Sequence, residues 1–144
     1  FAREILNEKK GPPPTVNLFN EKNIGETVLD LSRKNLIVSC HDVSLGGILT
    51  AVSKMCIKGK KGIKINSLKG LINKYEYFFG EDQARYIVEI EPKNLSKVEK
   101  ILKEDGIYYE NIGVTQKEYF EIEDELKIST KDLFKTNNEW YNNY

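Results

Sequence analysis

The sequence predicts an α+β fold in which one mixed, largely antiparallel sheet is covered by helices. Apolar residues recur at helical spacing over residues 21–35, where Ile24, Val28 and Leu31 fall at i, i+4 and i+7. Short apolar runs between turn residues, such as residues 86–90, predict strands. Several connections between predicted strands are too short for the crossover that parallel neighbours require. Helices and mostly antiparallel strands are therefore expected within one domain.

Turn and capping residues bound the other expected elements. Ser44 is a candidate N-cap for the helix after the first strand, and Asn94 and Gly106 are expected to bound a later helix. Residues 129–132 resemble a capping box with Asp in the fourth position, which would open a terminal helix. We also expect a helix-like segment at 1–10, strands at 36–39, 63–65, 108–115, 119–122 and 126–128, and a short helix opened by Ser67.

The domain organisation follows from length and from one proline cluster. Residues 1–20 are expected to form an interdomain helix and a stiff connector, because Gly11 and three consecutive prolines exclude a helix interior. Residues 21–144 have the length of one ordinary domain. The first residue is Phe1 rather than Met, so we expect a fragment of a longer multidomain chain.

Composition narrows the classes of partner. The 22 basic and 22 acidic side chains cancel, so nothing steers the whole molecule to nucleic acid or to an anionic membrane. No apolar run reaches the length of a bilayer span. Cys40 and Cys56 are too few for a disulfide framework and fit no zinc spacing, which favours a cytoplasmic location.

The first candidate site lies between a predicted strand and the following helix. Polar residues at the carboxyl end of a strand are well placed to face a ligand, and helix amino ends attract phosphate. The alternative is that these side chains only cap the turn, and the turn by itself favours that alternative. Cys40 and His41 are not a nucleophile and base, because adjacent strand residues point to opposite faces. The candidate residues here are His41, Asp42, Ser44, Gly46 and Gly47.

The second candidate site precedes the strand at 86–90 and contains Glu81, Asp82, Gln83 and Arg85. Only three of the 22 basic residues are arginine, so an arginine beside two carboxylates suggests a bidentate contact that lysine cannot reproduce. An internal ion pair that braces the turn is the equal alternative. Carboxylates from both turns could hold magnesium, but we assign no metal ligand and no catalytic residue.

Three stretches together resemble one known family. Residues 40–48 are similar to the signature H-D-[VL]-S-D-G-G-L, residues 79–86 to F-G-E-D-Q-A-R-Y, and residues 11–18 to G-x-P-P-x-V-D-L. All three occur in this order in the last domain of the phosphoribosylformylglycinamidine synthase family, which belongs to the aminoimidazole-ribonucleotide-synthetase-like superfamily. The chain departs from the signature at Leu45, where the family usually has Asp. The stretches read Cys40-His41-Asp42-Val43-Ser44-Leu45-Gly46-Gly47-Ile48, Phe79-Gly80-Glu81-Asp82-Gln83-Ala84-Arg85-Tyr86 and Gly11-Pro12-Pro13-Pro14-Thr15-Val16-Asn17-Leu18.

The resemblance implies a function. Family members are ATP-dependent ligases of purine biosynthesis that convert formylglycinamide ribonucleotide, glutamine and ATP to formylglycinamidine ribonucleotide, glutamate, ADP and phosphate. ATP and magnesium are expected to bind mainly to upstream domains, which also carry the general-base histidine. By resemblance, residues 41–47 and 81–85 face a cleft towards those domains. The implied partners are the upstream domains and, in the small form of the enzyme, a glutaminase subunit and a small bridging subunit.

Two other classes stay open from the sequence. One is the corresponding domain of another superfamily member, such as aminoimidazole ribonucleotide synthetase or selenophosphate synthetase. The segment Gly80-Glu81-Asp82-Gln83-Ala84-Arg85 argues against it, because those proteins would not carry it. The other is a non-catalytic assembly module.

Overall fold

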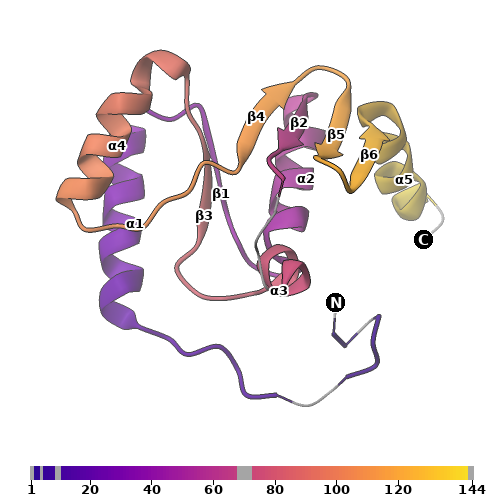
Figure 1. The fold of residues 1–144 in the computed structure, drawn as a ribbon, viewed down its shortest axis with the longest axis horizontal. Coiled ribbons are helices and arrows are strands. Elements are labelled where there is room, and N and C mark those ends of the chain that lie inside the picture. Colours follow the sequence, from indigo (N-terminus) through magenta and orange to yellow (C-terminus); the bar gives the residue numbers. More distant parts are fainter. Residues whose placement is uncertain (1, 4, 9–10, 68–72, 143–144) are drawn as a thin grey trace. The chain divides into compact units, whose positions relative to one another are not determined.

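The structure of the chain, a computed structural model, describes residues 2–3, 5–8, 11–67 and 73–142. It confirms the α+β class (Figure 1). In chain order the elements are α1 (Leu18–Arg33), β1 (Ser39–Asp42), α2 (Gly47–Gly59), β2 (Gly62–Ile65), α3 (Lys74–Phe79), β3 (Tyr86–Glu89), the 3-10 turn η1 (Pro92–Asn94), α4 (Leu95–Glu104), β4 (Gly113–Gln116), β5 (Tyr119–Ile122), β6 (Leu126–Ser129) and α5 (Thr130–Asn142).

The described strands form two sheets, so the prediction of one sheet is wrong. The chain makes two compact units, one of Phe1–Ala51 with Tyr75–Tyr109 and the other of Val52–Lys74 with Glu110–Tyr144. The first contains the antiparallel pair β1–β3, and the second a sheet of order β4-β2-β5-β6 in which only β2 and β5 are parallel. The predicted mixed, largely antiparallel character is confirmed. Strand patterns mark extended segments, but they do not determine which segments pair.

The core of the first unit joins the ends of α1 and α4. Leu31, Leu36, Val98 and Leu102 are buried together. Leu36 N donates to the Leu31 carbonyl at 3.0 Å while Asn35 takes a left-handed conformation with φ of 53°. This is the hydrogen-bond pattern of a Schellman helix end, with its accompanying apolar contact. Leu36 therefore belongs to the helix cap, and the strand predicted at 36–39 begins at Ser39 instead.

The same motif closes α4, as the sequence predicted. Gly106 has a φ of 66°, and Ile107 N donates to the Leu102 carbonyl at 2.8 Å. A buried hydroxyl then ties the two helices together, because Thr27 Oγ1 donates to Asp105 Oδ2 at 2.8 Å. Asn94 occupies the predicted N-cap position of α4, although its side chain makes no capping hydrogen bond.

The sheet of the second unit has one buried face and one polar face. Ile63, Ile65, Phe120 and Ile122 are buried. The parallel register of β2 with β5 places Ile63 opposite Phe120 and Ile65 opposite Ile122. Because side chains alternate along a strand, Lys64 and Glu121 project from the opposite face. One face of this sheet therefore forms the core, and the other carries charge.

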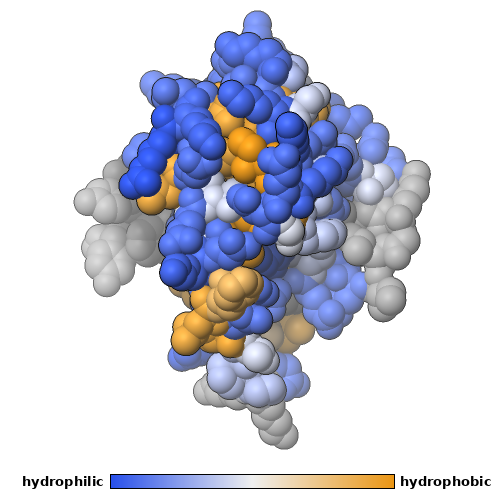
Figure 2. Space-filling model, turned by 90° about the vertical axis from the view of Figure 1, so that its left-hand side faces the viewer, coloured by the Kyte–Doolittle hydropathy of each residue, from blue (hydrophilic) through white to orange (hydrophobic). Residues whose placement is uncertain are grey.

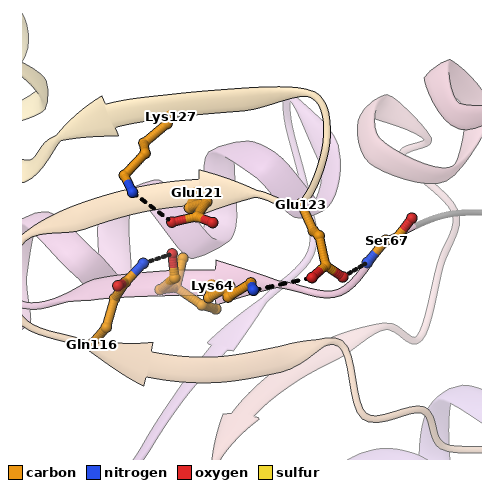
Figure 3. A network of polar contacts seen from close by, with 7 residues as sticks. Lys64, Ser67, Gln116, Glu121, Glu123 and Lys127 are labelled. Atoms are coloured by element: carbon orange, nitrogen blue, oxygen red, sulfur yellow. Dashed lines mark hydrogen bonds and ion pairs between the residues drawn. The ribbon is translucent and has the colours of Figure 1, made fainter.

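Ion pairs cross the polar face (Figure 3). Lys64 Nζ lies 3.0 Å from Glu123 Oε1, and Ser67 N donates to Glu123 Oε2 at 3.2 Å. These two contacts lower the pKa of Glu123, with the Lys64 hydrogen bond as the larger cause. The same hydrogen bond to Glu123 raises the pKa of Lys64. Lys127 pairs with Glu121 at 3.3 Å on the neighbouring strands.

Several boundary predictions need correction or confirmation. The described residues between 2 and 8 form turns and a bend rather than the predicted helix, because the proline-rich connector follows before a short helix could be stabilised. The strand predicted at 108–115 begins only at Gly113, because the residues before it are not paired with another described strand. The capping role of Ser129 is confirmed, since its Oγ accepts from Asp132 N at 3.0 Å. The helix predicted after Ser67 falls largely on residues 68–72, outside the described residues.

In the variant Glu123→Gln, the free energy of unfolding is expected to fall less on acidification than it does in the unchanged protein. A carboxylate whose pKa is lowered stabilises the fold above its unfolded-state pKa of about 4.3, and this contribution disappears as the pH falls through the folded-state value. Urea unfolding at about pH 7 and about pH 3 measures the difference. The pKa shift of Lys64 has the opposite sign. Its contribution to the stability of the fold is therefore present below its unfolded-state pKa and is lost as the pH rises through the raised folded-state value.

Glu125→Gln is the matched control, because it removes one carboxylate from the nearby ion pair with Lys74 at 2.7 Å. An unchanged pH dependence in Glu123→Gln would contradict the assigned role of Glu123.

Candidate functional site

The pairing of β1 with β3 brings the two predicted turns together. Asp42 lies opposite Tyr86 and His41 opposite Ile87 in the antiparallel register. Just beyond the strand end, Val43 N donates to the Arg85 carbonyl at 2.8 Å. Residues that are about forty positions apart in the sequence therefore meet at one end of this two-stranded sheet.

A side-chain hydrogen bond then joins the turns directly. Gly46 N donates to Glu81 Oε1 at 2.9 Å. Gly46 and Gly47 have φ values of 85° and 68°, which are favourable only for glycine. A Cβ on Gly47 would lie 2.5 Å from the Phe78 carbonyl oxygen, so the backbone at the end of α3 seals this residue. Gly47 therefore serves close backbone packing, whereas a Cβ on Gly46 would meet the Thr50 side chain. The helix α2 begins at Gly47 rather than at the predicted N-cap Ser44.

An open hollow of about 350 Å³ lies at this end of the sheet; we call it the β1–β3 hollow. Five of the predicted site residues line it: Asp42, Ser44, Glu81, Gln83 and Arg85. The other lining residues are Glu21, Val43, Leu45, Ala84 and Tyr86. Of the predicted residues, His41, Gly46, Gly47 and Asp82 lie outside this lining.

Sequence reasoning missed Glu21 and Ala84. Glu21 belongs to the first turn of α1, and nothing in its local pattern indicates that it approaches the hollow. Ala84 has a φ of 59°, an uncommon conformation for a residue with a Cβ, which turns the chain between Gln83 and Arg85. Its place inside the Gly80–Arg85 stretch was the available signal, but side-chain chemistry gave no reason to single it out.

Arg85 braces its own turn. Its Nη1 lies 3.3 Å from Asp82 Oδ2 and 3.4 Å from the Gly80 carbonyl oxygen. Both contacts are long, and the Asp82 side chain is 68% exposed, so solvent weakens this ion pair. The geometry favours the internal brace over the bidentate ligand contact that the scarcity of arginine also suggested.

The first turn shows no catalytic pair. Cys40 and His41 are neighbours in β1, so their side chains leave opposite faces of the strand. Desolvation of the thiol, and then the Asp42 carboxylate, raise the pKa of Cys40, which disfavours the nucleophilic thiolate. His41 Nδ1 lies 2.6 Å from the Asp42 carbonyl oxygen, an acceptor, so the proton resides on Nδ1. These contacts match the turn-capping interpretation of the motif.

The charges around the hollow do not suit a phosphate group. The carboxylates of Glu21, Asp42 and Glu81 outnumber the single guanidinium of Arg85. The Gly46 amide, which a phosphate would need, already donates to Glu81. The hollow therefore does not fit the phosphates of ATP, and no reaction step is assigned to it.

Two polar side chains at the hollow are uncommitted. Neither the Ser44 hydroxyl nor the Gln83 amide has a hydrogen-bond partner among the described residues. In addition, Glu21 Oε1 is buried and accepts no hydrogen bond from the part of the chain that the structure describes. In the described ranges, no three His, Cys, Asp or Glu side chains are grouped as a metal site. This lining is suited to neutral polar groups such as peptide amides.

Comparison with known proteins identifies the class. Residues 1–124 match the family described as "AIR synthase related protein, C-terminal domain". The chain belongs to this family. It is 54% identical over 144 residues to the phosphoribosylformylglycinamidine synthase subunit PurL of Pelagibacter ubique, and 35% identical to that of Rhodopseudomonas palustris. In both cases all of this chain is covered, but only 20% of the relative, so the chain spans about one fifth of their length.

Solved structures of PurL from Thermotoga maritima share the fold. The one described as complexed with FGAR has a TM-score of 0.74 at 18% identity, and the match covers 90% of this chain and 23% of that protein. The structure of PurLQS from the same organism has a TM-score of 0.71 at 20% identity, over 92% of this chain and 24% of that chain. No described helix has the length and apolar character needed to cross a bilayer.

Gly47→Ala is expected to destabilise the first unit more than Gly106→Ala. Both residues have positive φ, which costs a residue with a Cβ about 1 kcal/mol or more. A Cβ at Gly106 meets nothing within 4 Å, whereas one at Gly47 would collide with the backbone of Phe78 and Phe79. Overpacking adds about 1–3 kcal/mol, which urea unfolding would resolve. Equal losses for the two variants would show that Gly47 is not sealed by α3.

Glu81→Ala is expected to release the Gly46 amide. A hydrogen bond to a partly exposed carboxylate contributes about 1 kcal/mol, so amide hydrogen exchange at Gly46 should accelerate roughly fivefold. Asp82→Ala is the control, because it removes a neighbouring carboxylate that does not contact Gly46. Similar exchange rates in both variants would contradict the bond.

Proposed function

We propose that this chain is the C-terminal domain of a PurL-type phosphoribosylformylglycinamidine synthase. The complete enzyme would convert formylglycinamide ribonucleotide, glutamine and ATP to formylglycinamidine ribonucleotide, glutamate, ADP and phosphate. The observation that carries the proposal is 54% identity to the Pelagibacter ubique PurL along the whole of this chain. Residues 1–20 would include the connector to the preceding domain, although the last three of them already begin α1 (Leu18–Arg33), and residues 21–144 would form the rest of the domain.

The domain would contribute structure rather than catalytic groups. The β1–β3 hollow holds no nucleophile–base pair, and its carboxylates disfavour phosphate. ATP and magnesium would therefore bind mainly to upstream domains, as the resemblance implies. The polar residues Ser44 and Gln83 would face a neighbouring domain. In this arrangement the isolated chain has no catalytic activity.

The expected partners are the rest of the same polypeptide, a glutaminase subunit and a small bridging subunit. Supporting this, the fold is similar to part of a chain in the structure described as PurLQS from Thermotoga maritima. The expected location is the cytoplasm, where purine biosynthesis would take place. Neither nucleic acid nor a membrane is an expected partner, because the charges of the chain balance.

A chimera tests the proposal. The corresponding fifth of Pelagibacter ubique PurL is replaced by this chain, and ATP-dependent formation of formylglycinamidine ribonucleotide is measured with ammonia as nitrogen donor. We expect kcat/KM within about tenfold of the parent, because a structural domain contributes little differential transition-state binding. The matched control carries the Rhodopseudomonas palustris segment, which is 35% identical to this chain.

A folded chimera without activity, beside an active control, would contradict the proposal. The isolated 144-residue chain should release no phosphate from ATP. Measurable turnover by that chain alone would equally overturn the assignment of a non-catalytic domain.

A further inference from the structure

Lysines gather at one end of the sheet in the second unit. The connection between β4 and β5 passes over the start of β2, where Gln116 pairs with Gly62 (Figure 1). A Cβ on Gly62 would collide with the Tyr119 backbone, so the glycine allows this close crossing. The turn at 117–118 and the turn before β2 are therefore neighbours. We call the exposed lysines of this region the basic end: Lys54, Lys58, Lys60, Lys61 and Lys117.

The basic end has little acidic compensation. Residues 54–61 contain no acidic side chain, and the neighbouring turn at 117–118 contributes one carboxylate, that of Glu118. Lys54 precedes Lys58 by one turn of α2, so these two side chains lie on the same side of the helix. Apart from Lys61, the side chains of the basic end make no ion pair or hydrogen bond with any described residue. The lysines of the polar face are instead paired with carboxylates.

Lys60 occupies a position that favours glycine. Lys61 N donates to the Cys56 carbonyl at 3.1 Å and Lys60 N to the Ile57 carbonyl at 3.4 Å, which are the hydrogen bonds of a Schellman end to α2. Lys60 has a φ of 52°, which is unfavourable for a residue with a Cβ. The helix dipole favours lysine at this carboxyl end, but it does not account for Lys117 in the β4–β5 turn. Helix capping therefore does not explain the whole cluster.

We propose that the basic end is a docking surface for the acidic surface of a separate protein chain. Uncompensated charges of one sign steer a partner of the opposite sign and suppress wrong partners. Nucleic acid is disfavoured, because all three arginines belong to the first unit and neither turn has an aromatic side chain on which a base could stack. An anionic membrane is disfavoured, because neither turn exposes a large apolar side chain for insertion.

Binding of fluorescent poly-L-glutamate, a carboxylate probe, to the full-length protein that contains this chain tests the docking surface. We expect its affinity to fall about tenfold or more between about 50 and about 200 mM NaCl, because binding releases counterions. In the variant Lys60→Gly/Lys117→Gln, the affinity at the lower salt concentration should fall about fivefold. Glycine suits the positive φ of residue 60, so this variant removes charge without weakening the helix end.

The matched control is Lys97→Gln/Lys103→Gln, which removes two exposed lysines from α4 of the first unit. Most of the face that carries α1 and α4 is hydrophilic (Figure 2), so a polar replacement suits that surface. The affinity of the control for poly-L-glutamate should be unchanged.

Equal losses of affinity in the two variants, or no binding by the unchanged protein, would overturn the inference. Tighter binding of oligouridylate or of phosphatidylserine vesicles than of poly-L-glutamate, lost in Lys60→Gly/Lys117→Gln, would overturn it in favour of nucleic acid or a membrane.

Discussion

The candidate site depends on the hydrogen bond between the Gly46 amide and the Glu81 carboxylate. Antiparallel pairing of β1 with β3 brings the two turns to the same end of the sheet, but pairing alone does not fix the path beyond the strands. The Glu81 carboxylate supplies that constraint, 35 residues away in sequence from the amide it binds. The hollow, its charged lining and the exposed Leu45 all lie around this contact.

The same contact determines what the hollow cannot do. An amide at the start of a helix is a typical donor to phosphate, yet here a protein carboxylate already occupies it. The backbone of α3 packs directly against Gly47, so a phosphate group cannot approach the chain at this second glycine either. Arg85 is partly neutralised by Asp82. A signature with the appearance of a nucleotide loop therefore serves as an internal joint between the two turns.

In the second unit, charged side chains on one face of the sheet are likewise paired with one another. Lys64 and Lys127 each contact a carboxylate on the polar face, so the face carries charged groups without a strong net potential. The opposite face buries Ile63, Ile65, Phe120 and Ile122. The ion pairs on the polar face fit the balanced composition of the whole chain, in which acidic and basic residues are equal in number.

The sequence alone determined the α+β class, most element positions and the family. Helical periodicity, glycine after α4 and the strand at Tyr119–Ile122 are local signals, because they depend on backbone preferences and on alternation of side chains. It also identified five residues that line the hollow. Only the tertiary structure decided that the strands divide into two sheets, that Leu36 caps a helix, and that Glu21 reaches the hollow. The division of the sheets and the approach of Glu21 depend on contacts between segments distant in sequence, which no local pattern encodes. The Leu36 cap is a local hydrogen bond, but the burial of Leu36 against Val98 and Leu102 is a long-range contact.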